Sequence, residues 1–222
     1  EAFIQESIEM EPIFRYVDKK NAELKAKVER GELPESALDD PYKPFYVMLM
    51  ALVKILYLRP GLNRFVCNMK LYQKDDVSIG FTVKKKFADN AAEGLAFESF
   101  GPETNMDILY EKIVKEINAV KDENTLDNSV DMMDKFMKLP PFVLRPVFRF
   151  IRFLDRHGRV PYDFVKKDPN YASAFITNLG SIHLKSGYHH LSNWGTTSLF
   201  VIIGERKMKP FFDEKGNVTM KM

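Results

Sequence analysis

The sequence predicts an α+β fold in which helices and a mixed sheet form a sandwich. Apolar residues recur with a period of two in some segments and at helical spacing in others, without a regular βαβ rhythm. Apolar residues make up 45% of the 222 positions and charged residues 29%, an ordinary globular composition. No internal repeat or linker is visible. We therefore expect residues 1–222 to form a single domain, truncated at both ends because the chain starts with glutamate and stops within a predicted strand.

The N-terminal half contains predicted strands and two predicted helices. Residues 2–10 alternate apolar and polar side chains, which is typical of a half-buried strand. Pro12 opens a helix that we expect to end near Gly31, and residues 44–58 predict a second helix, apolar on all sides and nearly engulfed. Beyond it we expect a hairpin of two strands joined through residues 73–76, followed by a third strand: 64–72, 77–84 and 94–100.

The C-terminal half places helices before strands. Helical spacing of apolar residues predicts three helices, at 106–120, 126–138 and 141–157. Strand patterns follow at 172–177 and 198–204, and a final hairpin is predicted from 207–212 and 218–222 around the turn Asp-Glu-Lys-Gly-Asn. The order of these elements favours a sandwich over a doubly wound sheet.

Charge, cysteine content and hydropathy exclude several functional classes. The 33 basic and 31 acidic residues give a net charge of +2, which makes no electrostatic case for nucleic-acid binding. Cys67 is the only cysteine, so no intrachain disulfide can form, and we expect a cytoplasmic protein. The most apolar window, residues 45–58, contains Lys54 and falls short of the ~20 residues of a membrane span. A membrane is therefore an unlikely partner.

Four arginines lie along one face of the helix predicted at 141–157. Their spacing of i, i+4, i+7 and i+11 places Arg145, Arg149, Arg152 and Arg156 in one stripe, with apolar residues around much of the rest. Such a face binds anions or a membrane surface in some proteins. The alternative is a solvated face or a contact between subunits.

No generic catalytic or metal-binding motif occurs. The four histidines lack the partners and spacing of a metal site, so we expect no metal. The sequence also contains no glycine-rich phosphate loop and no Gly-x-Ser-x-Gly nucleophile elbow. Cys67 falls in an alternating segment, where we expect a buried and unreactive thiol.

Three stretches carry a specific resemblance. Residues 59–65 read Arg-Pro-Gly-Leu-Asn-Arg-Phe at the end of the apolar helix, and residues 76–83 form a central strand. Residues 174–180 read Ala-Phe-Ile-Thr-Asn-Leu-Gly, similar to the Phe-Thr-Ile-Ser-Asn-Leu-Gly segment of dihydrolipoyl acyltransferase cores of 2-oxoacid dehydrogenases. Together with the order of the elements, they make nearly the whole chain resemble the chloramphenicol acetyltransferase-like superfamily.

This resemblance implies a two-layer α/β sandwich with helices on one face of a mixed sheet. It also implies a homotrimer with active sites at the subunit interfaces. Members transfer an acetyl or other acyl group from coenzyme A, or from an acyl-lipoyl arm, to a hydroxyl or thiol. A histidine in a His-His-x-x-x-Asp-Gly motif serves as the general base, and a strand serine donates a hydrogen bond to the tetrahedral oxyanion.

The resemblance places Thr177 where the family has its serine. The threonine keeps the donor oxygen, so we expect Thr177 to be the oxyanion donor and Asn178 beside it to contact substrate. Without the resemblance, Thr177 reads as a strand threonine that makes a cross-strand contact.

The catalytic histidine motif departs from the family pattern. His189 and His190 are followed by Trp194 where the aspartate belongs, and they precede the final hairpin instead of following it. We therefore expect this pair to be structural or to line a pocket, and the general base to lie beyond Met222. The sequence thus predicts a coenzyme A-dependent acyltransferase. The alternative is an inactive trimeric scaffold or ligand-binding protein of the same fold.

Overall fold

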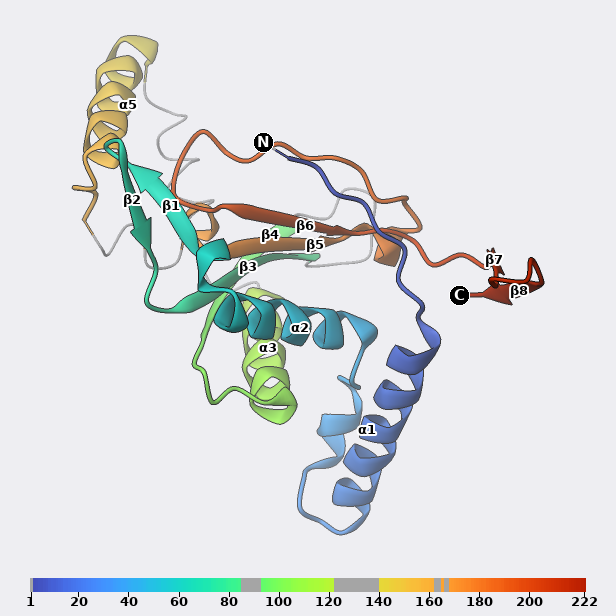
Figure 1. Ribbon diagram of the computed structural model, residues 1–222. Helices are drawn as coiled ribbons and strands as arrows, with labels where there is room; N and C mark the ends of the chain where they lie inside the picture. The colour runs from blue at the N-terminus through green and yellow to red at the C-terminus, as the bar shows by residue number, and fades with distance from the viewer. Residues whose placement is uncertain (1, 85–92, 122–139, 162–164, 166–167) are drawn as a thin grey trace.

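A four-stranded mixed sheet lies at the centre of the structure (Figure 1). The computed structural model describes residues 2–84, 93–121, 140–161, 165 and 168–222. The strand order is β4-β3-β5-β6, that is Glu93–Phe100, Val77–Lys84, Ala174–Asn178 and Leu199–Ile203. β3 pairs antiparallel with β4 and parallel with β5, which in turn pairs parallel with β6.

Helices cover one face of this sheet. α2 (Pro44–Leu58) and α3 (Met106–Lys121) lie against it on the same side (Figure 1), and α1 (Glu11–Glu29) packs beside α2. α2 starts with proline at its first position, where the missing N–H costs nothing. The prediction of a two-layer α/β sandwich with helices on one face is confirmed.

Alternation along the strands separates a core face from an outer face. Buried side chains on β3, β5, α2 and α3 make up the core between sheet and helices: Ile79, Phe81, Ala174, Ile176, Leu49, Val53, Leu109 and Ile113. Each fully buried large aliphatic or aromatic side chain of this kind contributes about 1.5–3 kcal/mol. The intervening residues point to the opposite side, and we define this outer face by five of them: Thr82, Phe175, Thr177, Phe200 and Ile202.

Two short hairpins flank the sheet. β1 (Arg64–Cys67) pairs antiparallel with β2 (Lys70–Gln73), and β7 (Lys209–Phe212) pairs with β8 (Val218–Lys221). The predicted pairing of 64–72 with 77–84 is wrong. The chain turns back earlier, at Asn68 and Met69, which both have positive φ (48° and 61°), as hairpin turns of two residues require.

The N-terminal residues do not form the predicted strand. Met10 N–H donates to the carbonyl of Met222 at 2.7 Å, so this segment runs beside the C-terminal hairpin without a strand ladder. Its apolar side chains stay largely exposed, including Ile4 at 85% and Ile8 at 62%. The apolar and polar residues of this segment alternate, but within the described residues no strand pairs with it, so neither side of the segment is buried in a sheet.

The remaining elements follow the sequence closely. α5 (Pro141–Arg156) lies at one end of the sheet, near β1 and β2 (Figure 1), and the short 3₁₀ helix η4 (Leu179–Ile182) follows β5 directly. The helix predicted at 126–138 falls outside the described residues. Among the helices that are described, none is long and apolar enough to cross a membrane.

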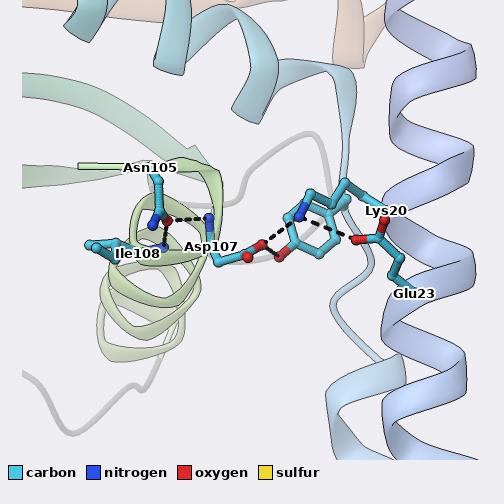
Figure 2. A network of polar contacts seen from close by, with 6 residues as sticks. Lys20, Glu23, Asn105, Asp107 and Ile108 are labelled. Carbon is cyan, nitrogen blue, oxygen red and sulfur yellow. Dashed lines mark hydrogen bonds and ion pairs between the residues drawn. The ribbon is translucent and has the colours of Figure 1, made fainter. Parts of the chain in front are cut away.

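A polar network joins α1 to the start of α3 (Figure 2). The Asp107 carboxylate accepts hydrogen bonds from Lys20 Nζ and from the hydroxyl of Tyr42, both at 2.9 Å. Asn105 Oδ1 accepts from the backbone N–H groups of Asp107 and Ile108 at 3.0 Å, which caps α3. The network therefore fixes the N-terminus of α3, whose inner side packs under the sheet.

Candidate functional site

Thr177 lies near the carboxyl end of β5, on the outer face of the sheet. Its neighbour Ile176 is buried against the helices, so alternation directs Thr177 to the other side, beside Ile202 of β6. Its side chain is half-buried. Thr177 is therefore not enclosed in the packed hydrocarbon of the core, and its side chain stays partly exposed on the outer face.

A second threonine shares this position. Thr82 of β3 and Thr177 of β5 have their Oγ1 atoms 3.1 Å apart, a hydroxyl–hydroxyl hydrogen bond in which either can donate. When Thr82 donates, Thr177 keeps its own proton for another acceptor, and donation along such a chain strengthens each bond. Sequence analysis did not single out Thr82. The sequence did hold a signal for it: Thr82 lies between Phe81 and Val83, which face the core, so alternation directs Thr82 to the outer face.

Asn178 leaves the strand on the opposite side from Thr177. It pairs with Ile203, which packs against the core, and it is the last residue of β5. Its backbone carbonyl accepts a hydrogen bond from the hydroxyl of Ser181 at 2.8 Å, at the start of η4. Asn178 is thus the last residue of β5 and points to the core face of the sheet. A ligand on the outer face that contacts Thr177 could reach Asn178 only by extending past the end of the strand.

Aromatic rings cross the outer face in a row. Phe175 lies over Gly80, where a Cβ would come within 2.8 Å of the Phe175 ring, so glycine is required for this close approach. Phe175 stacks on Phe200 with centroids 5.1 Å apart, and His189 stacks on Phe200 at 4.3 Å with an interplanar angle of 7°. The loop that carries His189 passes over the outer face in Figure 1. The fold therefore brings His189 to the face that holds Thr177.

His189 and His190 have defined ring contacts although both are exposed. His189 Nδ1 lies 2.5 Å from the carbonyl oxygen of His190, and His190 Nδ1 lies 3.0 Å from that of Leu191. A carbonyl can only accept, so in the neutral ring Nδ1 carries the proton and Nε2 is the basic nitrogen. No group of three or more potential metal ligands occurs within the described residues.

Close backbone contacts fix the loop beyond Thr177. A Cβ on Gly180 would lie 2.6 Å from the carbonyl oxygen of Gly204, and one on Gly204 would lie 2.4 Å from the backbone nitrogen of Ser186. The backbone of Leu184 adds hydrogen bonds to Leu179 and to Glu205. These contacts hold the carboxyl ends of β5 and β6 together, at the edge where ligands bind in many sheets with parallel strands.

Cys67 lies in a separate cavity of about 400 Å³. The cavity is lined from the β1–β2 turn, the C-terminal end of α5 and the loop before β6, and includes Asp155, His157, Asn193 and Thr196. The Cys67 thiol is half-buried and lies 3.5 Å from the carbonyl oxygens of Asp155 and Arg156. Thr177 does not line this cavity, so the two sites are distinct.

Comparison with known proteins finds likeness in structure and not in sequence. No family model and no curated protein matches the chain. A probable dihydrolipoamide acetyltransferase from Listeria monocytogenes superposes with a TM-score of 0.59 at 10% identity, over 96% of this chain and 68% of that one. The dihydrolipoamide acetyltransferase of Azotobacter vinelandii gives 0.58 at 13% identity, over 97% and 66%.

A third neighbour points to the same kind of protein. The cubic core of a pyruvate dehydrogenase multienzyme complex superposes with a TM-score of 0.50 at 12% identity, over 98% of this chain and 79% of that one. Identities this low establish the fold alone, and this chain spans about two thirds of the first two structures. The chain has the fold of the dihydrolipoamide acetyltransferases of known structure, as the resemblance of its sequence led us to expect.

Proposed function

We propose that this protein is an acyltransferase that moves an acetyl or other acyl group from a coenzyme A thioester to a hydroxyl or thiol acceptor. The observation that carries the proposal is the Thr82–Thr177 hydroxyl pair on the outer face of the sheet. The fold supports it, because the structural neighbours are acyltransferases. The Azotobacter enzyme has been studied for the role of a serine, a histidine and an asparagine in catalysis, and Thr177 offers the same hydroxyl chemistry as a serine.

The chemistry needs a donor for a negative oxygen. The acceptor oxygen or sulfur bonds to the thioester carbonyl carbon and gives up its proton to a base, which leaves a tetrahedral oxyanion. Thr177 donates a hydrogen bond to that oxyanion while its own oxygen accepts from Thr82. The carbon–sulfur bond then breaks, and the coenzyme A thiolate takes up the proton. A fixed donor of this kind contributes about 3 kcal/mol to the transition state.

The general base is a neutral imidazole in this proposal. Such a ring takes a hydroxyl proton near neutral pH. We assign the role to no residue of 1–222, because His189 and His190 lack the aspartate of the family motif. Assembly as a homotrimer and residence in the cytoplasm complete the proposal. The single cysteine fits a reducing compartment.

The test is a thiol-release assay with acetyl-coenzyme A over a panel of hydroxyl, thiol and amine acceptors. With an accepted partner, Thr177→Ala should lower kcat about 100-fold with little change in KM, because the hydroxyl acts on the transition state. Thr177→Ser should retain most of the activity. The matched control is Thr219→Ala on β8, because this threonine is exposed and belongs to a hairpin outside the central sheet. Unchanged turnover in Thr177→Ala would exclude the assigned role.

The second candidate is a catalytically inactive ligand-binding or scaffold protein of the same fold. The observation that favours it is Trp194 in place of the motif's aspartate. Tight binding of acetyl-coenzyme A, measured by calorimetry, with no thiol release for any acceptor would support this candidate over the enzyme.

A further inference from the structure

α5 exposes a continuous stripe of positive charge. Arg145, Arg149, Arg152 and Arg156 all lie on the solvent side of the helix, and their guanidinium groups form no ion pair within the described residues. The helix contains a single acidic residue, Asp155, whose carboxylate already accepts a hydrogen bond from the hydroxyl of Tyr171 at 2.5 Å. The helix therefore carries a formal charge of +3 on a chain whose total is +2.

Phe142 and Phe153 border the arginine stripe, and Phe150 is exposed on the next side of the helix. Phe142, Phe150 and Phe153 are 77%, 61% and 51% exposed. Phe142, Arg149 and Phe153 follow one another at i, i+7 and i+11, so an arginine lies between two phenylalanines in one row along the helix. Exposed rings of this size in a single patch mark an interaction surface.

The aliphatic residues of α5 lie on a different side of the helix from the arginines. Its aliphatic residues are half-buried, whereas the arginines and the three phenylalanines are not: Val143, Val147, Ile151 and Leu154. At its C-terminal end the helix is tied down through Tyr171 and through Cys67, whose thiol meets the last carbonyls. α5 thus presents an exposed surface on which cations and aromatic rings lie side by side.

A shallow, open hollow of about 440 Å³ lies beside the arginine stripe. The described residues that line it combine guanidinium groups with apolar side chains: Pro141, Leu144, Arg145, Phe148, Arg149 and Arg152. An anionic group with attached hydrocarbon matches both kinds of lining.

We propose that α5 docks this protein on an anionic phospholipid surface. The helix lies in the plane of the interface, where Phe142, Phe150 and Phe153 enter the boundary between headgroups and acyl chains and the arginines bind lipid phosphates. Amphipathic helices rich in arginine and phenylalanine bind in this way, and charge attraction adds to apolar burial. The arginines alone could bind any polyanion. The exposed phenylalanines favour a partner that also has an apolar region, as the acyl chains of a phospholipid do. This proposal departs from the expectation drawn from the sequence that a membrane is not a partner.

Co-sedimentation with vesicles tests this proposal on the full chain. The protein should bind phosphatidylglycerol–phosphatidylcholine vesicles and not phosphatidylcholine alone, and high salt should weaken binding because it screens the charges. The double variant Arg149→Gln/Arg152→Gln should bind about 30-fold more weakly, since each cation near the surface contributes about fivefold. Phe150→Ser/Phe153→Ser should weaken binding at least about tenfold through lost apolar burial.

Matched variants separate this surface from general charge. Arg15→Gln/Lys25→Gln removes the same charge from exposed positions of α1 and should bind as the unchanged protein does. Circular dichroism should show that each variant keeps its fold. Failure to bind anionic vesicles overturns the proposal, as does binding that is insensitive to the phenylalanine variants. It is also overturned if the arginine variants lose only self-association, which would assign α5 to a contact between copies. Acetyl transfer in solution should be unaffected by these variants, so the two proposals fail independently.

Discussion

The hydrogen-bond partner of the Thr177 hydroxyl comes from a residue far away in sequence. Its strand and its place in the Thr-Asn-Leu-Gly segment could be predicted from residues 174–180. Its partner Thr82 is separated from it by 95 positions, and only the parallel pairing of β3 with β5 brings the two oxygens to 3.1 Å. A strand pattern indicates which face a side chain takes but not which strand lies beside it.

Gly180 offers a stability prediction for the loop beyond Thr177. A methyl group there would lie 2.6 Å from the backbone oxygen of Gly204, which cannot move aside like a flexible side chain. We expect Gly180→Ala to lower the free energy of unfolding by about 1–3 kcal/mol, as overpacking does. Urea denaturation of the variant measures this.

Gly61→Ala is the matched control for that measurement. No atom lies within 4 Å of the position that its Cβ would take, and its φ lies outside the left-handed range. Its stability should stay within about 0.5 kcal/mol of the unchanged protein, or rise slightly. Equal losses in both variants would contradict the close contact between Gly180 and Gly204.

At the scale of elements, periodicity predicted most helices and strands but not every pairing. α2 begins and ends at the predicted residues because its apolar run is bounded by Pro44 and by Arg59-Pro60-Gly61. The hairpin at 64–73 was missed, because Asn68 and Met69 do not form one of the glycine-containing turn pairs that usually indicate a tight turn. The 2–10 segment was misassigned because alternation alone does not supply a partner strand.

The junction of α1 and α3 has a predictable pH dependence. The hydrogen bond from Lys20 is the largest effect on the pKa of Asp107 and lowers it. Burial opposes this effect, but the hydrogen bond from Tyr42 and the charge of Lys20 add to the lowering, so the pKa lies below its usual value of 3.8. The native state therefore binds fewer protons than the unfolded state, so the contribution to stability is full above about pH 4 and is lost as the pH falls through the native pKa. Because the carboxylate is 48% exposed, we expect a contribution of at most about 1 kcal/mol.

Asp107→Asn should remove this part of the acid sensitivity. Urea midpoints at neutral pH and near pH 3 should differ less for Asp107→Asn than for the unchanged protein. Asp75→Asn alters an exposed carboxylate that has no ion pair within the described residues and should leave the difference as it was. A variant as acid-sensitive as the parent would show that the network of Figure 2 adds nothing to stability at neutral pH.

At the scale of the whole molecule, the outer face is the main feature left for a partner. Helices cover the core face of the sheet, whereas every residue of β6 remains partly exposed at the sheet edge. Sequence resemblance predicted the layered fold, but it could not show which loops pass over the outer face, because such loops lack periodicity.

The proposed trimer has a direct mass test. Sedimentation equilibrium at micromolar concentration should give three times the 25.8 kDa of one chain. Association should bury the outer face, so Ile202→Lys should shift the protein toward monomer, since a buried charge without a partner is costly. The same substitution at Leu58, which is 74% exposed at the end of α2, should leave the mass unchanged. A monomeric parent protein would contradict the trimer.

The most direct test of the central claim is a crystal structure with an acetyl-coenzyme A analogue in which a methylene replaces the thioester sulfur. The account predicts that the analogue's carbonyl oxygen lies on the outer face within about 3 Å of Thr177 Oγ1, a normal hydrogen-bond distance. Thr82 should donate to Thr177 in that complex. A carbonyl bound elsewhere, with the Thr177 hydroxyl still paired only to Thr82, would contradict the account.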